Sequence, residues 1–123
     1  MDYIATSSAP SAIGPYSQAI VCGDTLYASG QIPINPETGA IEAKDIAGQT
    51  EQACKNVGEV LKAAGMGFEN VVKTTCFLSD IGNFAAFNEV YAKYFVSKPA
   101  RSCVAVKDIP KGALCEIEII AVR

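Results

Sequence analysis

The chain has 123 residues, of which half are hydrophobic and 19% are charged, and its formal net charge is −3 with no histidine. This length and balance are enough for one core of a sheet with covering helices, so residues 1–123 are expected to form a single domain. The acidic balance argues against binding to nucleic acid, and the missing histidine removes the commonest general base, the usual nucleophilic triads and most zinc sites.

No apolar run approaches the roughly 20 residues that a membrane-spanning helix needs, and "MDYIATSSAP" at the start lacks the basic and apolar regions of a secretory signal. We therefore expect a cytoplasmic protein that does not bind a membrane. The cysteines are scattered among apolar neighbours without C-x-x-C spacing, which favours reduced thiols in the core over a disulfide framework or a metal site. They are Cys22, Cys54, Cys76, Cys103 and Cys115.

The first half of the chain predicts a β-hairpin, a surface loop and a long helix. Residues 17–22 and 25–30 are two β-prone runs separated by a Gly-Asp pair, which is typical of a two-residue hairpin turn. The segment "IPINPETG" then indicates an ordered loop. After Asp45, a suitable N-cap, apolar residues recur at steps of three and four until Gly65, which predicts an amphipathic helix.

The second half predicts a strand, a helix and two more strands. The β-branched segment "NVVKTTCFLSD" reads as a strand and is followed by a helix near residues 83–95. Residues 101–106 and 114–122 form the last two predicted strands. The second helix carries an aromatic stripe that we expect to pack on the sheet, namely Phe84, Phe87, Tyr91, Tyr94 and Phe95.

This order of elements indicates an α+β sandwich in which two helices cover one face of a mixed sheet. In the last strand one set of alternate residues is apolar, whereas the other combines Glu116 and Glu118 with Ile120 and Val122. A face that is partly acidic and partly aliphatic suits a subunit interface better than open solvent. The sequence therefore predicts a symmetric oligomer.

Arg101 in "KPARSCVAV" is the first candidate for a binding residue, because it stands at the start of a strand that leads into the core. Its planar fork can bind a carboxylate or phosphate through two hydrogen bonds. The structural alternative is an ion pair with Glu116, Glu118 or another acid on the same sheet, and the local pattern alone favours that alternative. Cys103 shares the strand phase of Arg101 but has no histidine partner, so a packed thiol is expected rather than a nucleophile.

Glu116 and Glu118 share one phase of the last strand, about 7 Å apart by the strand rise. One of two such acids can have a raised pKa and activate water, although a solvated or interface-facing edge is an equally good reading of each acid alone. If the last two strands form a simple hairpin, Arg101 and Glu116 lie near its opposite ends. They would then meet only across a subunit boundary or through a different pairing.

Four further positions could line a cleft, each with a structural alternative. Tyr16 follows a Gly-Pro turn that could present its phenol, or it closes an edge of the core. Ser29 and Gly30 end a strand where the backbone can approach a ligand closely, although a Ser-Gly pair alone is weak support. Asn88 lies at the edge of the aromatic stripe, where its amide serves either an interface or a ligand.

Five motifs in register, "AIGPYSQAI", "YASGQIPINPETG", "KTTCFLSDIGNFAAFNEVY", "PARSCVAV" and "CEIEIIAV", cover almost the whole chain. Together they resemble the RidA (YjgF) family of reactive-intermediate deaminases. The resemblance implies a chorismate-mutase-like α+β fold with a six-stranded mixed sheet. It also implies a homotrimer with a central barrel and clefts between subunits. The implied activity is hydrolysis of 2-imino acids, released by pyridoxal-phosphate-dependent dehydratases, to 2-keto acids and ammonia, without a metal or organic cofactor.

The resemblance also implies roles for individual residues. Arg101 is similar to the family arginine that grips the substrate carboxylate, and Glu116 is similar to the glutamate that positions or activates water. Five further positions match residues that line the cleft in the family, namely Tyr16, Ser29, Gly30, Asn88 and Cys103. Of these, Cys103 is expected to act through its backbone.

Two other functions compete with the enzyme. A binding or regulatory module would capture small carboxylates such as keto acids without useful turnover, and it would need Arg101 as well. Glu116 favours hydrolysis, because a pure carboxylate binder gains nothing from a nearby anion. A chaperone or RNA-directed protein on the same scaffold has little support from a net charge of −3.

Overall fold

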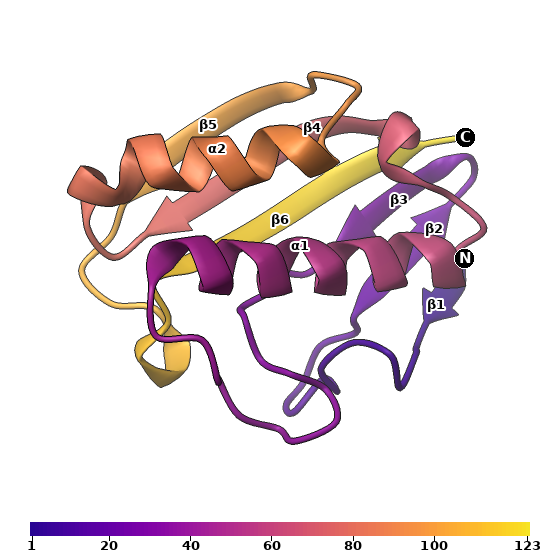
Figure 1. The fold of residues 1–123 in the computed structure, drawn as a ribbon. Helices are drawn as coiled ribbons and strands as arrows, with labels where there is room; N and C mark the ends of the chain where they lie inside the picture. Colours follow the sequence, from indigo (N-terminus) through magenta and orange to yellow (C-terminus); the bar gives the residue numbers. More distant parts are fainter.

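The computed structural model of the protein describes residues 1–123, which form one six-stranded sheet and two α-helices (Figure 1). Three short 3-10 helices, at Phe68–Asn70, Ile81–Asn83 and Pro110–Gly112, connect the larger elements. In chain order the larger elements are β1 (Asp2–Ile4), β2 (Ala19–Cys22), β3 (Thr25–Ala28), α1 (Ile46–Ala63), β4 (Val71–Leu78), α2 (Phe84–Tyr94), β5 (Ala100–Ala105) and β6 (Cys115–Val122).

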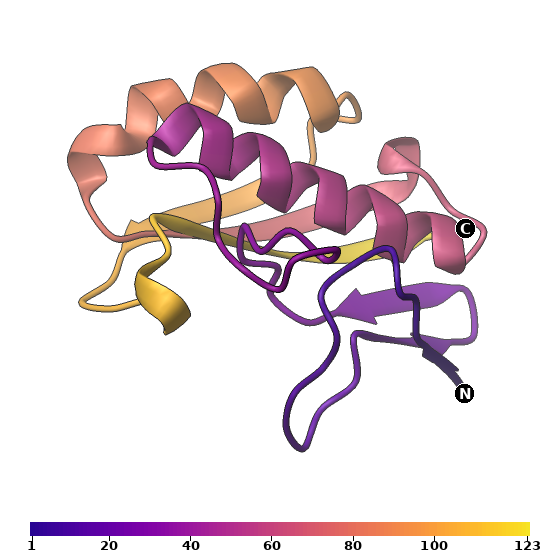
Figure 2. The same ribbon diagram turned by 60° about the horizontal axis from the view of Figure 1, so that its bottom comes forward.

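The strands follow the order β1-β2-β3-β6-β4-β5, and both helices cover the same face of the sheet (Figure 2). All neighbouring strands are antiparallel except β4 and β5, which are parallel and joined through α2. This arrangement confirms the mixed α+β sandwich. A simple hairpin of β5 and β6 is wrong, because β4 lies between them. No helix of the structure is both long and apolar enough to cross a membrane.

The N-terminal part of the sheet forms as the turn residues predict, with one addition. Gly23 has a φ of 62°, a left-handed conformation that glycine adopts without strain, and it turns the chain from β2 into β3. The sixth strand is β1, which pairs with β2 from Asp2↔Val21 to Ile4↔Ala19. Local pattern did not assign it, because three residues are too few to show a period.

Helix α1 begins and ends where the sequence predicts. The carboxylate of Asp45 accepts a hydrogen bond of 2.9 Å from the backbone N–H of Gly48, and Gly65 has a φ of 72° just beyond the last turn. The preceding loop is ordered as expected, because the buried Asn56 side chain donates hydrogen bonds to the carbonyls of Ile32 and Ile34.

Helix α2 packs only part of its aromatic stripe on the sheet. Phe87, Tyr91 and Phe95 are buried, and the Tyr91 and Phe95 rings stack with their centroids 4.2 Å apart. Phe84 is exposed, and Tyr94 is half-buried with its hydroxyl donating to Glu51 of α1. The prediction that all five rings pack on the sheet is therefore wrong for Phe84, which lies exposed at the start of the helix, whereas Tyr94 packs at the edge of the core on the side facing α1.

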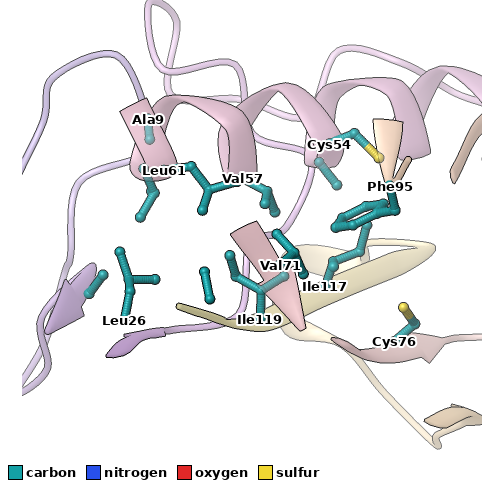
Figure 3. Close-up of a cluster of buried hydrophobic side chains, with 14 of the residues drawn as sticks. Ala9, Leu26, Cys54, Val57, Leu61, Val71, Cys76, Phe95, Ile117 and Ile119 are labelled. Atoms are coloured by element: carbon teal, nitrogen blue, oxygen red, sulfur yellow. The ribbon is translucent and has the colours of Figure 1, made fainter. Parts of the chain in front are cut away.

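The core lies between the helices and the covered face of the sheet. Figure 3 shows Val57 and Leu61 of α1 above Leu26 and Ile119 of the sheet, all of which are buried. Three of the five thiols are core residues as predicted, namely Cys54, Cys76 and Cys115, and none of the five forms a disulfide. Cys103 is only partly buried. Cys22 is exposed, contrary to the prediction, because it ends β2 at the hairpin turn.

Candidate active site

Arg101 lies in β5 with its side chain on the helix-covered face, where it meets α2. One Nη1–H donates a hydrogen bond of 2.7 Å to Oδ1 of Asn88. This is the single hydrogen bond that the chain provides to a guanidinium with five N–H donors. An ion pair with Glu116 or Glu118 is not formed, so the structural alternative weighed from the sequence does not explain this arginine.

Aromatic rings complete the surroundings of the Arg101 guanidinium. Its Cζ atom lies 4.8 Å from the ring centre of Tyr91 and 5.5 Å from that of Phe84, both within the range of cation–π attraction. Arg101, Asn88, Tyr91 and Phe95 belong to the lining of a cleft of about 550 Å³ between α2 and the start of β5. The cleft thus presents the positive charge of Arg101, with unused donors, and that of Lys98 beside apolar walls.

Glu116 lies in β6 on the opposite, uncovered face of the sheet. Gly30 approaches it so closely that a Cβ atom added there would lie 2.5 Å from Oε2 of Glu116. The two segments are joined by paired backbone hydrogen bonds between Gln31 and Ile117, of 2.8 and 3.0 Å. A side chain at position 30 would therefore displace the carboxylate. Glycine is needed at this position because the backbone passes close to Glu116, and not because of a left-handed turn.

The protonation of Glu116 is shifted by its surroundings. Burial raises the pKa of the Glu116 carboxyl, and the nearby charge of Glu118 raises it further. Such a carboxyl holds its proton at a higher pH than an exposed glutamate does, which suits a group that takes a proton from water and returns it.

Tyr16 and Ser29 lie on the same side of the molecule as Gly30. Tyr16 is exposed and lines a second cleft, of about 410 Å³, together with Gly30 and Lys111. The Ser29 hydroxyl donates a hydrogen bond of 2.6 Å to the carbonyl of Ser17. Its proton therefore holds the loop before β2 against the end of β3, and its oxygen can only accept from a ligand.

Cys103 faces the same side of the sheet as Arg101, as the strand phase predicts, since Arg101 pairs with Thr74 and Cys103 with Cys76 along the parallel β4. Burial raises the pKa of the Cys103 thiol, although the charge of Arg101 opposes this shift. A thiol with a raised pKa holds little thiolate at neutral pH and is a poor nucleophile.

One chain does not bring Arg101 and Glu116 together. Through Thr74, Arg101 is level with Ile119, three residues from Glu116 along β6. Strand spacing and rise put their Cα atoms about 14 Å apart, with the side chains on opposite faces. The sequence-predicted residues thus form two groups: Arg101, Asn88 and Cys103 on the covered face, and Tyr16, Ser29, Gly30 and Glu116 beside the uncovered one.

Sequence reasoning missed two features of these groups. It placed Phe84 and Tyr91 in the core stripe and did not assign either ring to Arg101. The signal was present in the spacing, because positions 84, 88 and 91 share one face of a helix. Lys111, which has a φ of 60°, lines the second cleft and was also not predicted, because no local pattern pointed to it.

Comparison with known proteins places this arrangement in a family. The sequence profile described as Endoribonuclease L-PSP matches residues 6–123. Human 2-iminobutanoate/2-iminopropanoate deaminase is 50% identical over 121 residues, which cover 98% of this chain and 88% of the human protein. AldR of Lactococcus lactis, whose name describes a candidate regulator, is 52% identical over 122 residues and covers 98% and 97% of the two chains.

Solved structures agree with the sequence relatives. The structure of E. coli TdcF with bound serine matches with a TM-score of 0.95 at 42% identity, covering 100% of this chain and 99% of that one. YyfA of Yersinia pestis, described as a member of the conserved Rid protein family, matches with a TM-score of 0.96 at 53% identity, covering 99% and 98%. The chain belongs to the Endoribonuclease L-PSP family, also called the YjgF/RidA family, as its motifs predict.

Proposed function

We propose that the protein hydrolyses reactive 2-imino acids, such as 2-iminobutanoate and 2-iminopropanoate, to 2-keto acids and ammonia. The observation that carries this proposal is the Arg101 guanidinium, which lines a cleft and receives from the chain only one neutral acceptor, Asn88. Relatives about 50% identical over nearly the full chain are named as deaminases of these imines. No metal or organic cofactor is needed for this chemistry.

Arg101 would bind the substrate carboxylate. The guanidinium fork matches a carboxylate in geometry and charge, and each charge-assisted hydrogen bond contributes about 1.5–3 kcal/mol. The carboxylate of a 2-imino acid is attached directly to the imine carbon. Holding the carboxylate therefore fixes the position of the reacting carbon, which is the main contribution that orientation makes to such a reaction.

Glu116 would act as the general base and general acid. Its carboxylate takes a proton from a water molecule while the water oxygen forms a bond to the carbon of the protonated imine, which gives a carbinolamine. The carboxyl then returns the proton to the amino nitrogen, and the resulting carboxylate takes the hydroxyl proton as the C–N bond breaks, the carbonyl forms and ammonia leaves. That proton finally passes to the solvent, where ammonia takes it up as ammonium. The raised pKa of Glu116 suits both steps. Tyr16, Ser29, Gly30 and the Cys103 backbone would line the same site.

The separation of Arg101 and Glu116 supports a site between two copies of the chain. Because the two residues lie on opposite faces, a site that uses both of them would take its second half from a neighbouring copy. The uncovered sheet face carries Ile20, Tyr27 and Ile120 side by side, since these residues pair across β2, β3 and β6. Burying this face in a homotrimer with a central barrel removes apolar surface from water, and light scattering should report three chains.

A carboxylate-binding or regulatory module is the second candidate. It is favoured by the name of AldR and by the structural match to TdcF with bound serine, a small carboxylate. Such a module uses the Arg101 cleft in the same way but gives no role to the raised pKa of Glu116. Turnover therefore separates the two candidates, whereas carboxylate binding alone does not.

The test couples a serine or threonine dehydratase to semicarbazide, which traps the released imine, and measures how far the purified protein suppresses trapping. Catalytic amounts should speed keto-acid formation, and Arg101→Ala should lower kcat/KM by about a hundredfold or more, because two hydrogen bonds of about 1.5 kcal/mol each are lost. Arg101→Lys keeps the charge without the fork and should recover little.

Arg123→Ala is the matched control for Arg101→Ala. Arg123 bonds to the carbonyls of Ala64 and Gly23, away from both clefts, so its loss should leave kcat/KM unchanged. Keto-acid formation that the wild-type protein does not accelerate, together with intact binding of 2-ketobutanoate, would favour the binding module. Full activity of Arg101→Ala would contradict the carboxylate site itself.

A further inference from the structure

Tyr91 connects the Arg101 guanidinium to the sheet through a buried contact. The Tyr91 ring lies 4.8 Å from Cζ of Arg101, and its hydroxyl is 2.8 Å from Oγ1 of Thr74, which is fully buried. Thr74 is in turn the residue of β4 that pairs with Arg101 of β5. Arg101, Tyr91 and Thr74 therefore contact one another in a closed set, in which β4, the strand paired with that of the arginine, holds the tyrosine.

The Tyr91 ring has little freedom to move. It is buried, it stacks on Phe95 with an angle of 18° between the rings, and it also lies against Phe87. Burial raises the pKa of the Tyr91 phenol, so the group is neutral at neutral pH. Tyr91 thus has the properties of a fixed aromatic platform and lacks those of an acid or base.

The other two contacts of the Arg101 guanidinium, with Phe84 and Asn88, constrain it less than Tyr91 does. Phe84 lies 5.5 Å from Cζ of Arg101 but is exposed, and it lies one helical turn before Asn88. Asn88 takes one Nη1–H at 2.7 Å. Since a guanidinium can rotate about its side-chain bonds, one amide acceptor and one exposed ring do not fix its plane. The buried ring of Tyr91 is the contact that can.

We propose that Tyr91, anchored by Thr74, is a positioning residue that fixes the plane of the Arg101 guanidinium and so sets the direction in which a carboxylate is bound. This inference rests on the proposed function only in taking Arg101 as the carboxylate-binding group. Tyr91 itself need not touch the substrate. Its ring acts on the ligand through Arg101, and Thr74 acts through Tyr91.

The test measures the full chain and its variants in two ways that do not depend on turnover. The first is the NMR resonance of the Arg101 Nε–H group, which a ring at this distance shifts upfield. The second is the affinity for 2-ketobutanoate, measured by calorimetry. Tyr91→Leu should remove the ring-dependent shift and weaken 2-ketobutanoate binding about tenfold. Tyr91→Phe keeps the ring but loses the contact with Thr74, so the ring-dependent shift should remain but change or broaden, and the affinity should stay within about threefold.

Tyr94→Leu is the matched control, since Tyr94 lies on the same helix but directs its hydroxyl to Glu51 of α1. It should lower the melting temperature without changing the Arg101 resonance or the affinity. Thr74→Val provides the test if Tyr91→Leu does not fold. This variant leaves the Tyr91 ring in place and removes the Thr74 hydroxyl that contacts it. We expect it to broaden or shift the Arg101 resonance and to add nothing in a Tyr91→Phe background.

The inference is overturned if folded Tyr91→Leu keeps both the resonance and the affinity of the wild-type protein. It is equally overturned if Thr74→Val lowers the melting temperature alone. Failure of the proposed function has a different signature, because the wild-type protein would then bind 2-ketobutanoate with a Tyr91-dependent affinity but would not accelerate imine hydrolysis.

Discussion

Arg101 and Glu116 face opposite sides of one sheet, and the chain holds their charges by different means. Arg101 is surrounded by side chains of α2, an amide at 2.7 Å and two aromatic rings. Glu116 is held by the close approach of Gly30 and by burial beside a second acid. The positive charge of Arg101 is thus stabilised by aromatic attraction, whereas the negative charge of Glu116 is destabilised by its surroundings.

This difference assigns the pH dependence of the protein to one half of the site. Arg101 offers hydrogen-bond donors and no acceptor, so the Arg101 half should contribute carboxylate binding and no general base. Glu116 has a raised pKa, so its ionisation should control any step that needs a base. Substitutions in the two halves should therefore separate binding from chemistry.

The largest effect expected in the Glu116 half comes from Glu116→Gln. Loss of a general base should lower kcat for imine hydrolysis by about a hundredfold or more, while the affinity for 2-ketobutanoate, which depends on Arg101, should change little. The carboxyl is protonated more readily in the folded than in the unfolded chain, so the free energy of unfolding falls as pH rises through its titration. Glu116→Gln removes that penalty and should not lower the melting temperature at neutral pH.

Glu118→Gln supplies the control for this assignment. Removing the like charge should lower the pKa of Glu116, so the acid limb of the pH–rate profile should move to lower pH without a large loss of kcat at neutral pH. An acid limb that stayed in place in Glu118→Gln, or that persisted in Glu116→Gln, would show that another group is the base.

A smaller effect is expected from Gly30→Ala. The added methyl group would lie 2.5 Å from Oε2 of Glu116, so the carboxylate has to move by a distance on the order of 1 Å. We expect kcat to fall about tenfold or more, with 2-ketobutanoate affinity largely kept. In a Glu116→Gln background, Gly30→Ala should lower kcat far less than it does in the wild-type protein, because the displaced group is already inactive. Equal losses of kcat in both backgrounds would point to a different role for Gly30.

Elements with strong local signals, including the hairpin of β2 and β3, were predicted correctly from the sequence, whereas the pairing of distant strands was not. The cap at Asp45 and the stop at Gly65 define α1 because they satisfy backbone groups locally. The position of β6 between β3 and β4 depends on how α2 returns the chain to the outer edge of the sheet. No residue of β6 encodes that path, so the sequence left the pairing of β5 and β6 open, and the structure shows that β4 lies between them.

The candidate site shows the same division between local and distant information. That Arg101 and Cys103 share a face follows from strand phase alone. That Arg101 and Glu116 lie on opposite faces depends on the register through β4, which the residues of β5 and β6 do not determine. A bulge in β4 near Val72 changes which residues of that strand face the core, and the sequence gives no sign of it.

The smallest effect is expected at Cys103, the remaining member of the Arg101 group. Its thiol has a pKa raised by burial and no base beside it, so it should exist as a neutral, packed group. Cys103→Ala should keep kcat/KM within about threefold, lower the melting temperature slightly, and leave the backbone atoms of position 103 where they are. If instead Cys103→Ala matched the loss in Arg101→Ala, and the wild-type thiol reacted rapidly with a disulfide reagent at neutral pH, then Cys103 would be a nucleophile. The Arg101 half would then hold chemistry as well as binding, and the contrast between the two halves would fail.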